Sequence, residues 1–153
     1  MTLSLTAQKA LTAYGGEDRW KKASAWDDLD HTYFSGYALW NYLTFPALLL
    51  RKDIQWQESS PGTLTALFPS ELPTHCPEQQ FLFNPSTGLL KQHNYTAEVI
   101  GSWAKAAHVV LEHSYWEGLP FASKRRVTPR KPDGSPRALP TLVAITVHEW
   151  RLS

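Results

Sequence analysis

The 153-residue sequence has little sulfur, with one cysteine, Cys76, and one methionine. A single cysteine cannot form an internal disulfide, and zinc sites built on cysteine need two or more thiolates. Nothing in the composition therefore indicates an oxidising compartment. A chain of this length buries roughly 68–70% of its unfolded surface, so it can fold without a covalent crosslink. We expect one domain, residues 1–153.

Long apolar runs and an excess of charge are also missing. No stretch approaches the about 18 apolar residues that span a bilayer, and the first residues lack the basic start and apolar centre of a secretory signal. The net charge of +1 gives no general attraction to nucleic acid or anionic membrane. No Gly-x-Ser-x-Gly, P-loop or dinucleotide fingerprint occurs. We expect a cytoplasmic protein with no membrane span, nucleic-acid partner or cofactor.

Aromatic residues are abundant, with seven Trp, six Tyr and six Phe. This ring area exceeds what a core of this size needs, so part of it is predicted to line a cavity for a flat or apolar molecule. The alternative is that the rings form ordinary core. The candidate ligand-binding tryptophans are Trp40, Trp56, Trp103 and Trp116.

The spacing of apolar residues predicts a mainly β (α+β) protein. Residues 4–23 have helical spacing interrupted by Gly15-Gly16, and they predict an N-terminal helical segment. From residue 26 onward the apolar period is two, which predicts a sheet over residues 26–152. Strands are predicted at residues 26–35, 37–43, 48–56 and 62–68, and then in a run of antiparallel hairpins from Gln79 to Leu152.

The predicted strands do not alternate with helices, which excludes the α/β classes. A sheet of about eight to ten strands should curl or close, because large twisted sheets rarely stay flat. We therefore expect a curved antiparallel sheet or half-barrel, with the N-terminal helical segment packed on one face.

Two short stretches resemble the fold of the outer-membrane lipoprotein carriers. They are Ala13–Trp20, with its Gly-Gly step between helices, and Tyr115–Phe121, an aromatic-acidic-Gly-apolar-Pro turn; the strand at Leu142–Leu152 also fits. The resemblance implies a half-barrel with an apolar concave face. The same fold serves a cofactor-free enzyme of violacein biosynthesis, whose active-site residues match no positions here. The carriers are periplasmic and have a signal peptide, so lipoprotein trafficking is not carried over.

Histidines recur on neighbouring strands of the predicted hairpins. His93 and Tyr95 share one strand face, and His108 shares a face with Glu112, whereas His113 lies on the opposite face if the strand is regular. Paired strands would bring these groups together, and imidazole titrates near neutrality, so they are candidates for moving protons. The competing interpretation is that each histidine is hydrogen-bonded in the core or solvated.

A basic run from Lys124 to Arg137 covers a predicted hairpin loop and lacks interleaved aromatics, so we interpret it as solvated rather than nucleic-acid-binding. Arg125 and Arg126 must point to opposite faces of their strand, so one of them points inward. We assign Arg126 to the catalytic candidates and Arg125 to the ligand-binding ones. The spacing of Asp28, Asp30 and His31 is not specific for a metal, and no metal site is predicted.

Together these features predict that the concave face binds an apolar or aromatic small molecule, with cofactor-independent catalysis on it as an extension. The catalytic candidates are His93, Tyr95, His108 and Arg126. The alternative is a non-catalytic interaction module that pairs through an exposed sheet edge or forms a homodimer.

Overall fold

The structure is a computed structural model, and it describes residues 28–149 and residue 151. By internal contacts the chain divides at Gly36 into two units. The described part of the first unit is the first half of helix α3 (Asp28–Leu43), and the rest of the described chain belongs to the second unit. The predicted helical segment 4–23 lies outside the described residues, and the single-domain organisation stays a prediction.

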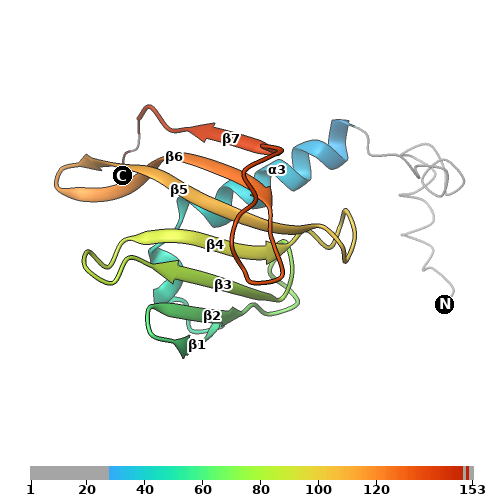
Figure 1. The fold of residues 1–153 in the computed structure, drawn as a ribbon, viewed down its shortest axis with the longest axis horizontal. Coiled ribbons are helices and arrows are strands. Elements are labelled where there is room, and N and C mark those ends of the chain that lie inside the picture. The colour runs from blue at the N-terminus through green and yellow to red at the C-terminus, as the bar shows by residue number, and fades with distance from the viewer. Residues whose placement is uncertain (1–27, 150, 152–153) are drawn as a thin grey trace, which may run out of the picture. The chain divides into compact units, whose positions relative to one another are not determined.

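The second unit is built on a seven-stranded antiparallel sheet in which every strand pairs with its neighbours in the sequence. In Figure 1 the sheet runs from β1 at one edge to β7 at the other, and it curves without closing. The predicted fold class, mainly β with a curved antiparallel sheet and a preceding helix, is confirmed. A 3-10 helix, η1 (Ala47–Leu50), precedes the strands β1 (Gln55–Ser60), β2 (Thr63–Leu67), β3 (Glu78–Phe83), β4 (Leu90–Thr96), β5 (Lys105–Trp116), β6 (Leu119–Pro129) and β7 (Val143–Thr146).

The register of the central strands places one row of side chains across the sheet. Phe81 on β3 pairs with His93 on β4, His93 with His108 on β5, and His108 with Val127 on β6. Directly paired residues project to the same face. The last turns of α3 cover this face, because the ring of Tyr42 lies 4.1 Å from the ring of His108. We call it the helix face.

The opposite face is covered in part by the long connection between β6 and β7, which folds back across the sheet in Figure 1. The carbonyl oxygen of Gly134 in this connection accepts hydrogen bonds from the side chains of Gln92 (2.8 Å) and Asn94 (3.3 Å). Both side chains are buried. The loop therefore satisfies polar groups that would otherwise be exposed on a central strand.

The strands predicted at 26–35 and 37–43 are wrong, because Asp28–Leu43 is a helix. Its buried residues Ala38, Asn41 and Tyr42 are spaced by three and one, which is the helical pattern. The segment contains five aromatic residues and Thr32, all of which favour strands, so residue propensity pointed away from the observed helix. Helix α3 replaces two predicted strands, which is why the sheet has seven strands and not eight to ten. The strand predicted at 48–56 begins later, as β1, because Ala47–Leu50 is a 3-10 helix.

The later hairpins follow the prediction closely. The turn predicted at Tyr115–Phe121 is the β5–β6 connection, with Glu117 and Gly118 both at positive φ. The last strand is shorter than predicted and covers only Val143–Thr146. Among the described residues, no helix is long and apolar enough to cross a membrane.

Candidate functional site

A group of buried imidazoles and phenols lies on the helix face, between the end of α3 and the central strands. We call it the imidazole–phenol cluster. Its members come from α3, the loop before β3, and strands β4 and β5, and all of them are less than 7% exposed. The cluster consists of Tyr42, His75, His93, Tyr95 and His108.

The hydroxyl of Tyr42 joins three elements of the structure. It lies 2.7 Å from Nε2 of His75 and 2.7 Å from the hydroxyl of Tyr95. The rings of His75 and Tyr95 stack at 3.9 Å with an angle of 9° between their planes. Tyr42 therefore ties the helix to the loop before β3 and to β4 through one oxygen atom.

His93 is held by Gln79 on the neighbouring strand. The Nε2 atom of His93 lies 2.6 Å from Oε1 of Gln79, and the amide nitrogen of Gln79 donates to the carbonyl of Cys76 at 2.9 Å. Because the amide oxygen can only accept, Nε2 of His93 must carry the proton. Phe81 stacks on the other side of this ring at 4.3 Å. The position and tautomer of His93 are thus set by its neighbours.

His108 differs from the other members of the cluster in its hydrogen bonding. It is 2% exposed, and neither of its ring nitrogens has a hydrogen-bond partner within the described part of the chain. Its ring meets the ring of Tyr42 edge-on, at 90°. A buried polar group without a partner is uncommon in folded proteins and indicates a place for a water molecule or a ligand.

The cluster is uncharged at neutral pH. Burial lowers the pKa of His75 and of His108 to about 3. Burial, and then the nearby His108, hold the pKa of His93 well below its usual range. Burial likewise raises the pKa values of Tyr42 and Tyr95. Neutral imidazoles with such low pKa values can donate and accept hydrogen bonds, but they are weak bases.

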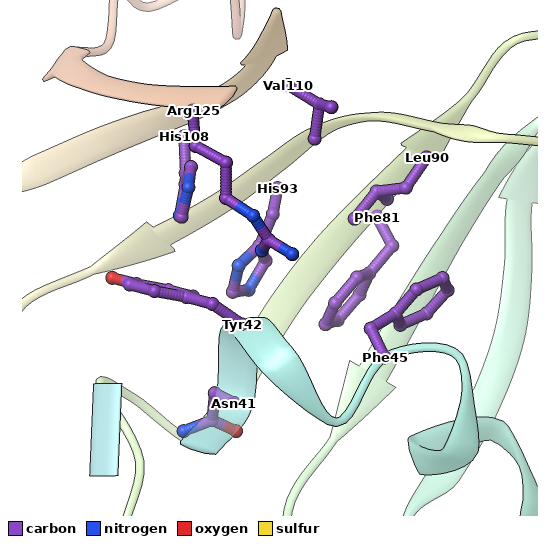
Figure 2. Close-up of a pocket in the computed structure, with 9 residues that line it drawn as sticks. All are labelled: Asn41, Tyr42, Phe45, Phe81, Leu90, His93, His108, Val110 and Arg125. Atoms are coloured by element: carbon purple, nitrogen blue, oxygen red, sulfur yellow. The ribbon is translucent and has the colours of Figure 1, made fainter. Parts of the chain in front are cut away.

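Arg125 enters the same region from β6. It is 6% exposed, and its only hydrogen bond among the described residues runs from Nε to the carbonyl of Ala122, at 3.2 Å. Burial lowers the pKa of Arg125 to about 10, so the guanidinium remains charged at neutral pH. Figure 2 shows its side chain extending toward Tyr42 and His93. A buried charge of this kind normally has a carboxylate partner or an anionic ligand.

Arg125 lines two pockets, as do Phe45 and Leu90. The inner pocket, about 10 Å³, lies beside Tyr42, His93 and His108 (Figure 2) and has room for about one water molecule. The outer pocket, about 110 Å³, shares Arg125 with it and is mainly apolar. Two residues of the outer pocket, Pro46 and Gly88, are exposed, so it reaches the surface. Its other lining residues are Phe45, Leu89, Leu90, His113, Pro120, Phe121 and Ala122.

His113 lines the outer pocket because β5 is irregular. The register of β5 with β6 shifts between Val110 and Glu112 and again between Glu112 and His113. The first shift adds Leu111 to β5 and the second adds Ser123 to β6, and an added residue reverses the alternation of its own strand beyond it. Glu112 therefore projects away and pairs with Lys124 at 2.6 Å. A regular strand would have placed Glu112 with His108 and would have turned His113 to the other face.

The structure brings together four of the residues singled out from the sequence: His93, Tyr95, His108 and Arg125. Arg126 lies on the opposite face, paired with Val109 and Ala144. Of the four predicted tryptophans, two pack in the core: the ring of Trp56 lies 5.2 Å from the ring of Phe81, and Trp40 packs against the same cluster. Trp103 is 76% exposed, and Trp116 lies at the end of β5. None of these four lines the inner or the outer pocket.

Sequence reasoning missed Tyr42, His75 and Gln79. Tyr42 belongs to a segment whose secondary structure was mispredicted. His75 lies in a loop between Pro73 and Pro77, where no periodicity indicates which way a side chain points. Gln79 could have been found, because it begins the predicted hairpin run and strand alternation places it on the same face as Phe81.

No group of three or more His, Cys, Asp or Glu side chains among the described residues is placed to hold a metal ion. No family model, curated protein or solved structure matches the chain. Beyond the curved antiparallel sheet itself, the resemblance to the lipoprotein carriers stays a prediction.

Proposed function

We propose that the protein binds a small apolar or aromatic molecule in the outer pocket, next to the imidazole–phenol cluster. The observation that carries this proposal is the pocket itself, which opens to the surface through Pro46 and Gly88 and is lined by Phe45, Leu90 and Phe121. Apolar pockets that end in a few fixed polar groups are the usual form of small-molecule sites.

The dimensions of the pocket restrict the size of the ligand. Its volume is about 110 Å³, whereas pockets for drug-sized ligands have roughly 300–1,000 Å³. It is somewhat smaller than an engineered closed cavity of about 150 Å³ that accepts benzene, but it opens to the surface. A single ring or a short branched chain fits this space. A larger ligand would need part of its bulk outside the pocket or a shift of the surrounding side chains.

Catalysis on the bound molecule, without a cofactor, is a further part of the proposal. It would use His93, Tyr95 and His108, which border the pockets or hydrogen-bond with residues that do. Because the imidazoles have low pKa values, their role would be to donate and accept hydrogen bonds rather than to act as general bases at neutral pH. The half-barrel relationship to the lipoprotein carriers, supported by the curved open sheet and the Glu117-Gly118 turn, belongs to this proposal too.

The proposal is tested by filling the pocket. Ligand-observed NMR and calorimetry with indole, phenol, toluene and benzoate should detect saturable binding to the protein. Ala122→Leu adds three carbon atoms to the pocket wall and should weaken that binding by at least about tenfold, a loss of about 1.4 kcal/mol. Ala144→Leu, an exposed position on β7, is the matched control. Absence of binding by every probe, or equal binding by folded Ala122→Leu, would refute the proposal.

A second candidate function is an interaction module, and the open edges of the sheet favour it. Within the part of the chain that the structure describes, strands β1 and β7 each pair on one side only, and most of their side chains are exposed. Unpaired strands can add a strand from another chain. Sedimentation of the protein across a hundredfold concentration range separates the two candidates. A homodimer that forms as concentration rises, without small-molecule binding, would favour the module.

A further inference from the structure

We infer that the ligand of the outer pocket is a small monocarboxylic acid, whose carboxylate pairs with Arg125 and whose apolar part fills the space between Phe45, Leu90 and Phe121. This inference rests on the proposed binding function and names the chemical class of the ligand. It is argued from the charges around Arg125, from the place of this residue in the lining of both pockets, and from the shape of a guanidinium.

Among the described residues that line the two pockets, none supplies a negative charge to balance Arg125. No residue that lines either pocket is acidic, and none of the buried polar side chains among the described residues is a carboxylate. The nearest titratable groups are the imidazoles of His93, His108 and His113 and the phenol of Tyr42. Burial keeps all four uncharged at neutral pH. The site therefore carries a single unbalanced positive charge.

A buried arginine without a counter-charge is costly, because its head group has lost water and gained little in exchange. One hydrogen bond, from Nε to the carbonyl of Ala122, fixes the direction of the side chain. Its two terminal nitrogens make no hydrogen bond or ion pair to the described residues, and the side chain borders both pockets. The guanidinium is therefore held in place with its strongest donors still available.

The geometry favours a carboxylate over other anions. The planar fork of a guanidinium matches the two oxygens of a carboxylate and binds them with parallel hydrogen bonds. A phosphate dianion would leave excess negative charge, because Arg125 is the only positive group in the lining of either pocket. The aromatic and aliphatic walls beyond the guanidinium fit an apolar substituent. Arg125 also lines the inner pocket together with His108, whose ring nitrogens have no partner among the described residues.

The test compares acids with their uncharged counterparts. Calorimetry at pH 7 should show that benzoate, phenylacetate and 3-methylbutanoate bind at least about tenfold more tightly than benzamide, phenylacetamide and 3-methylbutanamide, because hydrogen bonds between a guanidinium and a carboxylate are stronger than those to a neutral amide. Inorganic phosphate should not compete with benzoate. If amides bind as tightly as acids, or if phosphate displaces benzoate, the inference is overturned.

Neighbouring arginines provide a matched pair of variants. Arg125→Gln should remove the preference for the acids, reducing their affinity at least about tenfold while leaving the amides within about twofold. Arg126→Gln removes the same charge from the opposite face and should change neither affinity. Circular dichroism confirms that both variants fold.

The two proposals fail differently in these experiments. If the acids and the amides bind equally well, and Arg125→Gln changes nothing while Ala122→Leu weakens both, the pocket is a binding site without carboxylate selectivity. In that case the inference falls and the proposed function stands. If no probe binds and neither variant has an effect, the proposed function falls as well.

Discussion

Arg125 is the residue whose environment fits its chemistry least well in the free protein, and this misfit has a measurable consequence. Its charge is buried without a carboxylate, and only Nε is hydrogen-bonded within the described chain. We expect Arg125→Met to raise the free energy of unfolding by about 1 kcal/mol or more, because methionine fills similar space without a desolvated charge. Urea unfolding of the ligand-free variant and parent measures the difference.

The control for this prediction is Arg137→Met in the connection between β6 and β7. Arg137 is exposed, so its guanidinium is solvated and the same substitution should not stabilise the protein. An Arg125→Met variant that is less stable than the parent would mean that the charge is already balanced, and the reasoning about its environment would then be wrong.

Tyr42 gives a second prediction at the scale of single residues. Its hydroxyl makes hydrogen bonds of 2.7 Å to His75 and of 2.7 Å to Tyr95. Tyr42→Phe removes both bonds while keeping the ring, so it should lower the free energy of unfolding by about 1–3 kcal/mol. Tyr95→Phe removes one of them and should cost less. Thermal and urea unfolding measure both variants.

A matched control for the phenol variants is Tyr115→Phe, because Tyr115 is 65% exposed and has solvent for its hydroxyl. It should change stability by less than about 0.5 kcal/mol. A loss for Tyr42→Phe no larger than that for Tyr115→Phe would show that the buried hydroxyl bonds contribute nothing net. The Tyr42→Phe/Tyr95→Phe double variant should then show no coupling.

At this scale the sequence predicts residues on regular strands and little else. Alternation placed His93 and Tyr95 on one face, and strand pairing brought His108 beside His93, as the register confirms. The same alternation requires that Arg125 and Arg126 diverge, but it does not say which one faces inward. That choice depends on the register with β5 and β7, which is a tertiary property.

The helix α3 is the element that sequence reasoning failed to find, and Gly36 explains part of the failure. In the sequence, a glycine between Phe34 and Tyr37 indicates the end of a strand, whereas in the structure Gly36 lies in the interior of a helix. A Cβ added at Gly36 meets nothing within 4 Å. Gly36→Ala should therefore stabilise the protein by about 0.5–1 kcal/mol through helix propensity. Thermal unfolding followed by circular dichroism at 222 nm measures it.

The contrasting variant is Gly134→Ala in the loop over the opposite face. Gly134 has φ of +85°, where a side chain is strained. This substitution should cost about 1–3 kcal/mol although the space for a methyl group exists. A gain in stability for Gly36→Ala and a loss for Gly134→Ala would confirm the helical conformation of Gly36 and the positive φ of Gly134. A destabilising Gly36→Ala would contradict the helix.

The bulges in β5 show a second limit at the scale of elements. Regular alternation along β5 would place His108 and Glu112 on the same face. Because the register shifts, His113 lines the outer pocket and Glu112 forms an ion pair with Lys124. An extra residue in one strand leaves no reliable trace in the hydrophobic pattern. The predicted existence of β5 and β6 is therefore confirmed, whereas the facing of their residues beyond Val110 could not be predicted.

At the scale of the whole second unit, the sheet determines how the protein responds to acid. Three imidazoles, those of His75, His93 and His108, are buried on the helix face. Burial holds the pKa of His75 and of His108 at about 3 and that of His93 well below its usual range. In the unfolded chain each would titrate near its usual value of about 6.5.

The sign of the effect follows from which state binds more protons. Between about pH 6.5 and pH 3 the unfolded chain is protonated at these histidines and the folded protein is not, so acid favours unfolding. Their contribution is complete above pH 6.5 and is lost as the pH falls toward 3. Each histidine contributes a slope of up to about 1.4 kcal/mol per pH unit, so the three together reach roughly 4 kcal/mol per unit.

Urea unfolding from pH 7.5 down to pH 4.5 should therefore show a steep loss of stability that begins near pH 6.5. His108→Asn should reduce the slope by about one third, because it removes one of three equal contributions. His148→Gln, which removes an exposed imidazole, should leave the slope unchanged.

The same folded samples, followed by NMR of the imidazole carbons, should show His75, His93 and His108 uncharged at pH 5. Titration of these resonances near pH 6.5 without unfolding would show that the cluster is open to water, and the closed helix face described above would be incorrect.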